Sequence, residues 1–153
     1  MPQEKYVAFH VRWGDKLRYE AFYYNMQTYV DQVLKLSSNE TAVYLATSDE
    51  SAFIQARAIF EHPAPLIYMP KLYWQDQPRG TGLVMSAVDE GKEYLGLLRL
   101  LFDIDALLQS YKCVVSFSSN MGRFVNYYRY AKEYDRIGET VIDIERDDLK
   151  RRH

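Results

Sequence analysis

Hydrophobic positions along the chain follow two alternating patterns. Short runs rich in Val, Ile, Tyr or Phe predict strands at about residues 5–12, 41–47, 65–69, 112–117 and 139–144. Apolar residues at helical spacing predict helices between them, at about residues 22–36, 50–60, 90–110 and 120–133. This alternation is typical of a parallel sheet covered by helices. We therefore expect an α/β protein with an open, Rossmann-like parallel sheet and helices on both faces.

The helix predicted at about residues 90–110 is apolar round most of its circumference. We therefore expect this helix to be largely buried. One of its faces would be formed by Tyr94, Leu97, Leu101, Ile104 and Leu108. Residues 70–84 ahead of it show no clear periodicity, which predicts a surface loop.

Composition places the chain among globular proteins. Of its 153 residues, 48% are hydrophobic and 26% are charged, which leaves little room for long disordered segments. We expect one domain over residues 1–145 and a charged tail over residues 146–153. The formal net charge of -2 provides no overall field that would draw the chain to nucleic acid or anionic lipid. The sequence contains no membrane segment and no targeting signal.

The sequence also lacks the patterns of disulfide and metal sites. Cys113 is the only cysteine, so no internal disulfide can form. His10, His62 and His153 are too scattered to suggest a metal site. We expect neither a metal nor a cofactor.

Candidate chemistry begins where the first predicted strand ends, in the segment His10-Val11-Arg12-Trp13-Gly14-Asp15-Lys16. Side chains alternate along a strand, so His10 and Arg12 share one face. Ligands of open parallel sheets bind beyond the carboxyl ends of the strands, and these side chains suit a phosphate there. The alternative is that Arg12 and Asp15 form a local ion pair and that His10 is an ordinary half-buried histidine.

A second candidate follows the strand predicted at about residues 112–117. Ser119 is a natural N-cap of the next helix, whose backbone N–H groups and positive dipole end suit an anion. Arg123, about one turn further on, would reinforce this anion site. The alternative is a plain helix cap with an exposed arginine.

Acidic residues provide three further candidates. Asp103 lies among apolar residues and needs a partner, either Arg99 one turn back or the two N–H donors of a purine such as guanine. Asp49 stands at a helix start, where an acid usually complements the dipole. Glu20 follows the first motif by a short loop and is either a solvated acid or a general base near the phosphate.

Together these segments resemble the sugar-nucleotide-binding half of the α-1,6-fucosyltransferase family (glycosyltransferase family 23), which includes the N-glycan core enzyme and the rhizobial nodulation enzyme. The resemblance lies in order and spacing and covers nearly the whole chain. It is carried by His10-Val11-Arg12-Trp13-Gly14-Asp15-Lys16, by Val43-Tyr44-Leu45-Ala46-Thr47-Ser48-Asp49, and by Asp103-Ile104 with Phe117-Ser118-Ser119-Asn120 and Arg123. The resemblance implies the nucleotide-sugar-binding lobe of a GT-B-like glycosyltransferase.

By this resemblance the donor is GDP-fucose, and the product is an α-1,6-linked fucose on an N-acetylglucosamine of an N-glycan or related oligosaccharide. The reaction would invert the anomeric centre and need no metal. The family's donor-binding roles would fall on Arg12 at the β-phosphate, on His10 and Asp103 at the guanosine, and on Ser119 and Arg123 around the diphosphate. Ser118 would be a further donor-binding residue.

The catalytic roles carry over in the same way. Glu20 matches the family's proposed base, with Lys16 beside it in the proton relay. Asp49 matches an acid of the second motif that belongs to the donor site. Trp13 and Ser48 depart from the pattern, because family members usually carry a second arginine and an acid at these positions.

Family enzymes also have a second lobe ahead of this one, so the resemblance implies that a missing N-terminal lobe or a homo-oligomer completes the acceptor site. The alternative is a non-catalytic GDP-sugar-binding module without an acceptor lobe. A eukaryotic relative would work in the Golgi lumen and a bacterial one in the cytoplasm.

Overall fold

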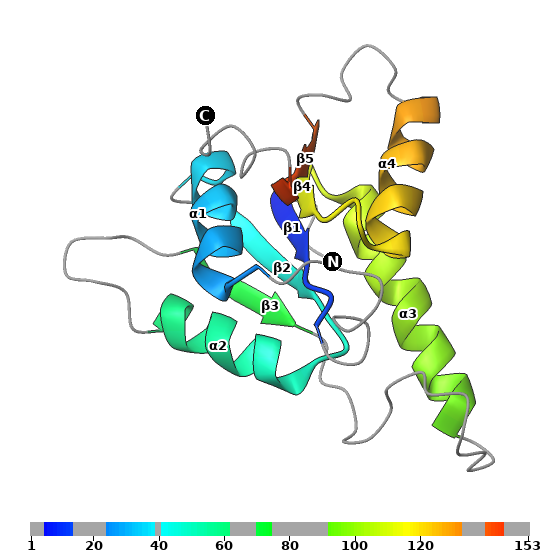
Figure 1. Ribbon diagram of the computed structural model, residues 1–153, viewed down its shortest axis with the longest axis horizontal. Coiled ribbons are helices and arrows are strands. Elements are labelled where there is room, and N and C mark those ends of the chain that lie inside the picture. The colour runs from blue at the N-terminus through cyan, green and yellow to red at the C-terminus, as the bar shows by residue number, and fades with distance from the viewer. Residues whose placement is uncertain are drawn as a thin grey trace.

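A parallel sheet forms the centre of the molecule. The structure is a computed structural model that describes residues 5–13, 24–38, 41–61, 70–74, 92–132 and 140–145. In these residues the strands are β1 (Tyr6–His10), β2 (Ala42–Ala46), β3 (Leu72–Trp74), β4 (Lys112–Val115) and β5 (Val141–Asp143). Their order across the sheet is β3-β2-β1-β4-β5, and every neighbouring pair is parallel (Figure 1).

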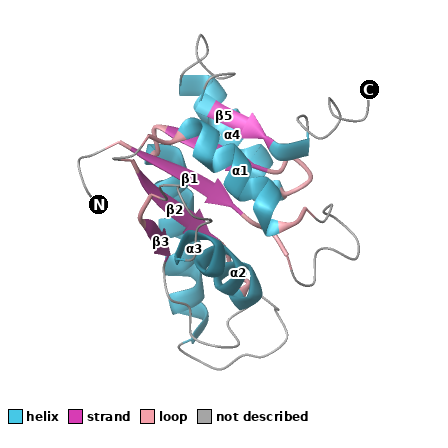
Figure 2. Cartoon of the chain, turned by 90° about the vertical axis from the view of Figure 1, so that its left-hand side faces the viewer, coloured by secondary structure: helices cyan, strands magenta, loops and turns pink. Residues whose placement is uncertain are grey.

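Helices cover both faces of this sheet. One face is covered by α1 (Met26–Leu36) and α2 (Glu50–Glu61), and the other by α3 (Lys92–Gln109) and α4 (Asn120–Lys132) (Figure 1). Because each helix returns the chain to the start of the next strand, the strands end at one common edge (Figure 2). The expected α/β fold with an open, Rossmann-like parallel sheet is confirmed.

Alternation along β1 divides the core into two clusters. All five residues of β1 are buried. Val7 and Phe9 pack in the cluster beneath α1 and α2, whereas Tyr6 and Ala8 pack in the cluster beneath α3 and α4. Burial of a side chain such as Phe9 contributes about 1.5–3 kcal/mol. A central strand with apolar residues on both faces therefore holds the two helical layers together.

The direction of the connections reverses between β1 and β4. From β1 the chain crosses to β2 by way of α1, whereas from β4 it crosses to β5 by way of α4 on the opposite face. In open α/β sheets, ligands bind in the crevice that such a reversal creates at the carboxyl ends of the strands. His10 ends β1 and Ser116 follows β4, so the two predicted phosphate motifs meet at this point.

Two element boundaries differ from the sequence predictions. The first helix begins at Met26 rather than near residue 22, because the Asn25 side chain accepts the Thr28 N–H at 2.9 Å and caps the helix there. The segment at residues 70–84, predicted as a loop, contains β3, which is three residues long and too short to show a period. The strand predicted at residues 65–69 and the tail at residues 146–153 lie outside the described residues.

The prediction that α3 is largely buried is wrong. Asp103, Ala106 and Leu107 are buried against the sheet. Four large apolar side chains on its other sides are between 41% and 52% exposed, namely Leu97, Leu98, Leu101 and Phe102. The sheet covers only one side of α3, and the first half of the helix extends beyond the strands (Figure 1). No helix in the described part of the chain is both long and apolar enough to cross a membrane.

Candidate functional site

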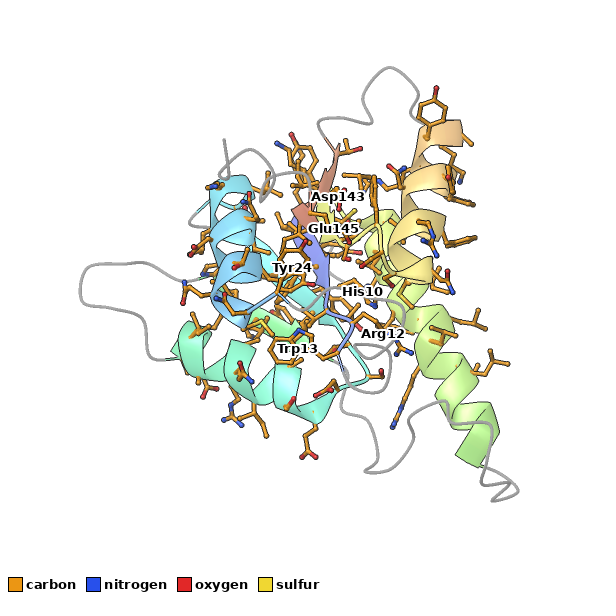
Figure 3. The ribbon with its side chains drawn as sticks, viewed as in Figure 1. His10, Arg12, Trp13, Tyr24, Asp143 and Glu145 are labelled. Carbon is orange, nitrogen blue, oxygen red and sulfur yellow. The ribbon has the colours of Figure 1, made fainter. Side chains whose placement is uncertain are left out.

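His10 and Arg12 lie on the side of β1 that faces α3 and α4, as the alternation of side chains predicts (Figure 3). Val11 and Trp13 take the opposite side and belong to the core beneath α1 and α2. The Val11 N–H donates to the Ala46 carbonyl at 3.1 Å, so pairing with β2 continues past His10. This pairing keeps the backbone extended and fixes the side from which Arg12 projects.

His10 is buried as a neutral imidazole. Its side chain is 4% exposed, so His10 is more buried than the half-buried alternative assumed. Burial, together with the nearby charge of Arg12, lowers the pKa of His10 to about 3. Its Nδ1 is buried and has no hydrogen-bond partner among the described residues. Because an unpaired buried polar atom costs about 1–3 kcal/mol, a ligand that pairs with Nδ1 would bind favourably.

Arg12 reaches from the end of β1 to the end of β2. Its Nη1 donates to the Ser48 hydroxyl at 3.2 Å. The Thr47 hydroxyl donates to the Val11 carbonyl at 2.9 Å and ties the same two strand ends together. The guanidinium therefore lies at the carboxyl edge of the sheet, near the expected crevice. The predicted site residues Lys16 and Glu20 lie outside the described residues, as does Asp15.

Trp13 anchors the chain where it leaves β1. It is 4% exposed, and its indole N–H donates to the Tyr24 carbonyl at 3.2 Å (Figure 3). Where the fucosyltransferases that the motifs resemble usually carry a second arginine, this chain thus has a buried apolar anchor. Trp13 therefore adds no charge to the crevice.

The start of α4 brings Ser119 and Arg123 to the same edge. The Arg123 N–H donates to the Ser119 carbonyl at 3.0 Å, which places Ser119 at the N-cap position. The Arg123 guanidinium donates to the Phe117 carbonyl at 3.3 Å and to the Asn120 side chain. A cation beside the positive end of a helix dipole is unfavourable by itself. An anion bound here would therefore be attracted both by Arg123 and by the helix.

Two acids that sequence reasoning missed shape the loop between β4 and α4 (Figure 3). An Asp143 oxygen accepts the Phe117 N–H at 3.2 Å, and a Glu145 oxygen accepts the Ser118 N–H at 2.7 Å. These loop N–H groups are therefore not available to a ligand. The sequence did carry a signal for both acids, because they lie at the end of the last predicted strand. The ends of parallel strands meet at one edge of the sheet, so β5 ends beside β1 and β4.

Asp103 bonds to a side chain that the sequence did not suggest. The Tyr44 hydroxyl, from β2, donates to an Asp103 oxygen at 2.6 Å. Burial raises the pKa of Asp103 to about 6, and the hydrogen bond from Tyr44 opposes part of this rise. Arg99, one of the two partners considered, has a buried Nη1 with no hydrogen-bond partner among the described residues.

Asp49 caps α2. One of its oxygens accepts the N–H groups of Ser51 at 2.8 Å and of Ala52 at 3.2 Å. The Phe53 N–H donates to the Asp49 carbonyl at 3.2 Å, as expected for an N-cap residue. This capping role, at the helix start where the sequence suggested an acid that complements the dipole, accounts for this oxygen of Asp49.

No family model and no curated protein sequence matches this chain. The likeness to the α-1,6-fucosyltransferases thus rests on the three motifs quoted above. Within the described residues, His, Cys, Asp and Glu side chains do not gather in groups of three or more that could hold a metal ion. At the carboxyl edge of the sheet, the described part of the site therefore consists of cations, hydroxyls and the acids Asp143 and Glu145, while the buried Asp103 lies on α3 against Tyr44 of β2.

The raised pKa of Asp103 predicts a specific pH dependence of stability. The folded protein binds this proton more tightly than the unfolded chain, whose carboxyl has a pKa near 3.8, so Asp103 lowers stability as the pH rises from about 4 to 6. Asp103→Asn keeps an oxygen for the Tyr44 hydroxyl and removes the titration. The variant should therefore gain about 2–3 kcal/mol relative to wild type over this range. Urea denaturation at pH 4, 5, 6 and 7 measures the difference.

His10 provides a control whose effect on stability should change with pH in the opposite direction. Because burial lowers its pKa to about 3, His10 contributes stability that is lost as the pH falls from about 6.5 toward 3. In His10→Gln this loss should disappear, so the stability of the variant relative to wild type should rise as the pH falls. A difference between Asp103→Asn and wild type that stays constant with pH would show that the Asp103 pKa is not raised.

Proposed function

We propose that this chain binds GDP-fucose and is the donor-binding lobe of an inverting α-1,6-fucosyltransferase. The observation that carries the proposal is the convergence of two motifs at the point where the sheet connections reverse. His10 ends β1 and Arg12 follows it, while Ser119 and Arg123 follow the neighbouring β4. A diphosphate bound at this crevice would lie between the two arginines.

The side chains near this crevice suit the donor's charge. Arg12 would hold the β-phosphate and Arg123, beside the start of α4, the rest of the diphosphate. As fucose leaves, negative charge builds on the β-phosphate, and a fixed guanidinium stabilises this charge more than it stabilises the bound donor. A lysine would replace Arg12 poorly, because it lacks the planar fork that binds two phosphate oxygens.

The buried acid on α3 suits the donor's base. Guanine presents two adjacent N–H donors, and an ionised carboxylate is an acceptor only. Tyr44 donates to one oxygen of Asp103 and orients the group. Because the pKa of Asp103 is about 6, its carboxylate is mainly ionised at neutral pH and can accept from guanine. Neutral His10 would contribute to the same guanosine pocket.

In the proposed reaction the acceptor 6-hydroxyl attacks the anomeric carbon of fucose. The carbon–oxygen bond to the β-phosphate breaks, and GDP leaves with the electron pair. The acceptor proton passes to Glu20, with Lys16 in the relay. A base in this position typically contributes about 10²–10⁴ in rate.

Arg12→Ala tests the proposal most directly. Loss of a charge-assisted contact to phosphate should weaken GDP and GDP-fucose binding about tenfold to a hundredfold, as measured by isothermal titration calorimetry. The matched control is Arg57→Ala, which removes an exposed arginine of α2 that, among the described residues, pairs with Glu61 one turn away. This control should bind both ligands like wild type.

Three results would contradict or narrow the proposal. Unchanged GDP binding by Arg12→Ala would remove the role assigned to that side chain. ADP that binds as tightly as GDP would contradict the guanine pocket at Asp103. GDP-fucose binding without transfer to an N-glycan would favour a binding module that depends on another lobe or chain for the acceptor.

A further inference from the structure

The hydroxyls of Ser116 and Ser118 form a directed chain of hydrogen bonds with Glu145. Ser116 Oγ donates to Glu145 Oε1 at 2.5 Å, and the two serine oxygens lie 2.7 Å apart. A serine hydroxyl has one proton to donate, and an ionised carboxylate can only accept. The Ser116 proton is therefore taken by Glu145, and the proton between the two serines must come from Ser118.

Because of this direction, Ser118 has no N–H or O–H group left to donate to a ligand. Its N–H donates to Glu145 Oε1 at 2.7 Å, and its hydroxyl proton is directed to Ser116. Only the lone pairs of Ser118 Oγ remain. The side chain is partly exposed, at the carboxyl edge of the sheet. A phosphate oxygen is also only an acceptor, so Ser118 cannot bond to it, whereas a ligand hydroxyl can donate to Ser118.

We infer that Glu145 sets the direction of this chain so that Ser118 accepts a hydrogen bond from a hydroxyl of the donor's sugar. The inference rests on the proposed function and deepens it, because it separates recognition of the sugar from recognition of the diphosphate. Ser118 then contacts the sugar itself. Glu145 acts through Ser116 and Ser118 and is a positioning residue.

The test compares GDP with GDP-fucose, which differ by the sugar. Isothermal titration calorimetry of Ser118→Ala should show GDP-fucose bound about three- to tenfold more weakly and GDP bound as by wild type. Glu145→Ala should reduce the preference for GDP-fucose over GDP in the same way, since Ser118 is then free to turn its proton outward. Glu145→Gln keeps an Oε1 acceptor for both donors and should restore the wild-type preference.

A matched control is Ser37→Ala, because Ser37 follows α1 at the opposite edge of the sheet and, within the described residues, bonds to carbonyls of that helix. This variant should bind both ligands like wild type. Equal weakening of GDP and GDP-fucose by Ser118→Ala would overturn the inference and place Ser118 at the diphosphate. Unchanged binding of both ligands would overturn it too. Wild-type protein that binds neither ligand would overturn the proposed function, and the inference with it.

Discussion

Replacement of Arg129 by methionine should lower the free energy of unfolding by about 3–5 kcal/mol. Arg129 lies on α4 and is 3% exposed. Its guanidinium donates to the carbonyls of Leu107 at 3.4 Å, Ser110 at 2.9 Å and Tyr111 at 3.2 Å. These carbonyls lie at the end of α3, where helical partners are lacking and the dipole is negative. Methionine fills similar space but leaves the Ser110 and Tyr111 carbonyls without the Arg129 donor, whereas the Leu107 carbonyl keeps the Ser110 hydroxyl at 2.8 Å.

Chemical denaturation of the variant and of Arg57→Met measures this effect. Arg57 forms an exposed i,i+4 pair with Glu61, and its loss should cost less than about 0.5 kcal/mol. Arg129→Lys keeps the charge without the planar fork and should fall between wild type and Arg129→Met. Equal losses in the Arg129 and Arg57 variants would contradict the role of Arg129 in joining α4 to the end of α3.

Much of the sheet could be predicted from the sequence, because its central strands are continuous apolar runs. β1, β2 and β4 lie where such runs predict them. β3 could not be predicted in the same way, since three residues contain too little pattern and depend on pairing with β2. The exposure of α3 was unpredictable for another reason: apolar residues all round a helix do not indicate which side the sheet will cover.

Some features of the candidate site could likewise be predicted from the sequence, and others could not. The alternation of side chains along a strand was enough to place His10 and Arg12 on one side of β1. The partner of Asp103 could not be read from the sequence, because Tyr44 lies 59 residues away and meets Asp103 only when α3 packs on β2. Glu145 lies 29 residues beyond Ser116, and its role depends on β5 lying beside β4. Contacts across strands follow from strand order, which local patterns do not contain.

Gly122 is the position where a single methyl group should disturb this site most. The Cβ of an alanine at this position would lie 2.0 Å from the Ser116 carbonyl oxygen and 2.9 Å from the Ser116 carbonyl carbon. The same Ser116 oxygen accepts the Ser119 N–H at 3.1 Å, so it cannot move without opening the turn ahead of α4. The close approach of α4 to the end of β4 therefore requires glycine at this position.

Gly122→Ala should lower the free energy of unfolding by about 3 kcal/mol or more, because backbone must shift on one side of the contact. By the proposed function, any folded variant should also bind GDP more weakly, since a shift at the start of α4 displaces Ser119 and Arg123. Gly96→Ala is the matched control: apart from its chain neighbours and its own helix backbone, no atom of the described residues lies within 4 Å of its Cβ, so helix propensity should stabilise this variant by about 0.5–1 kcal/mol. Chemical denaturation and titration calorimetry of both variants test these expectations. Wild-type stability in Gly122→Ala would contradict them, because the loop would then tolerate a wider separation from α4.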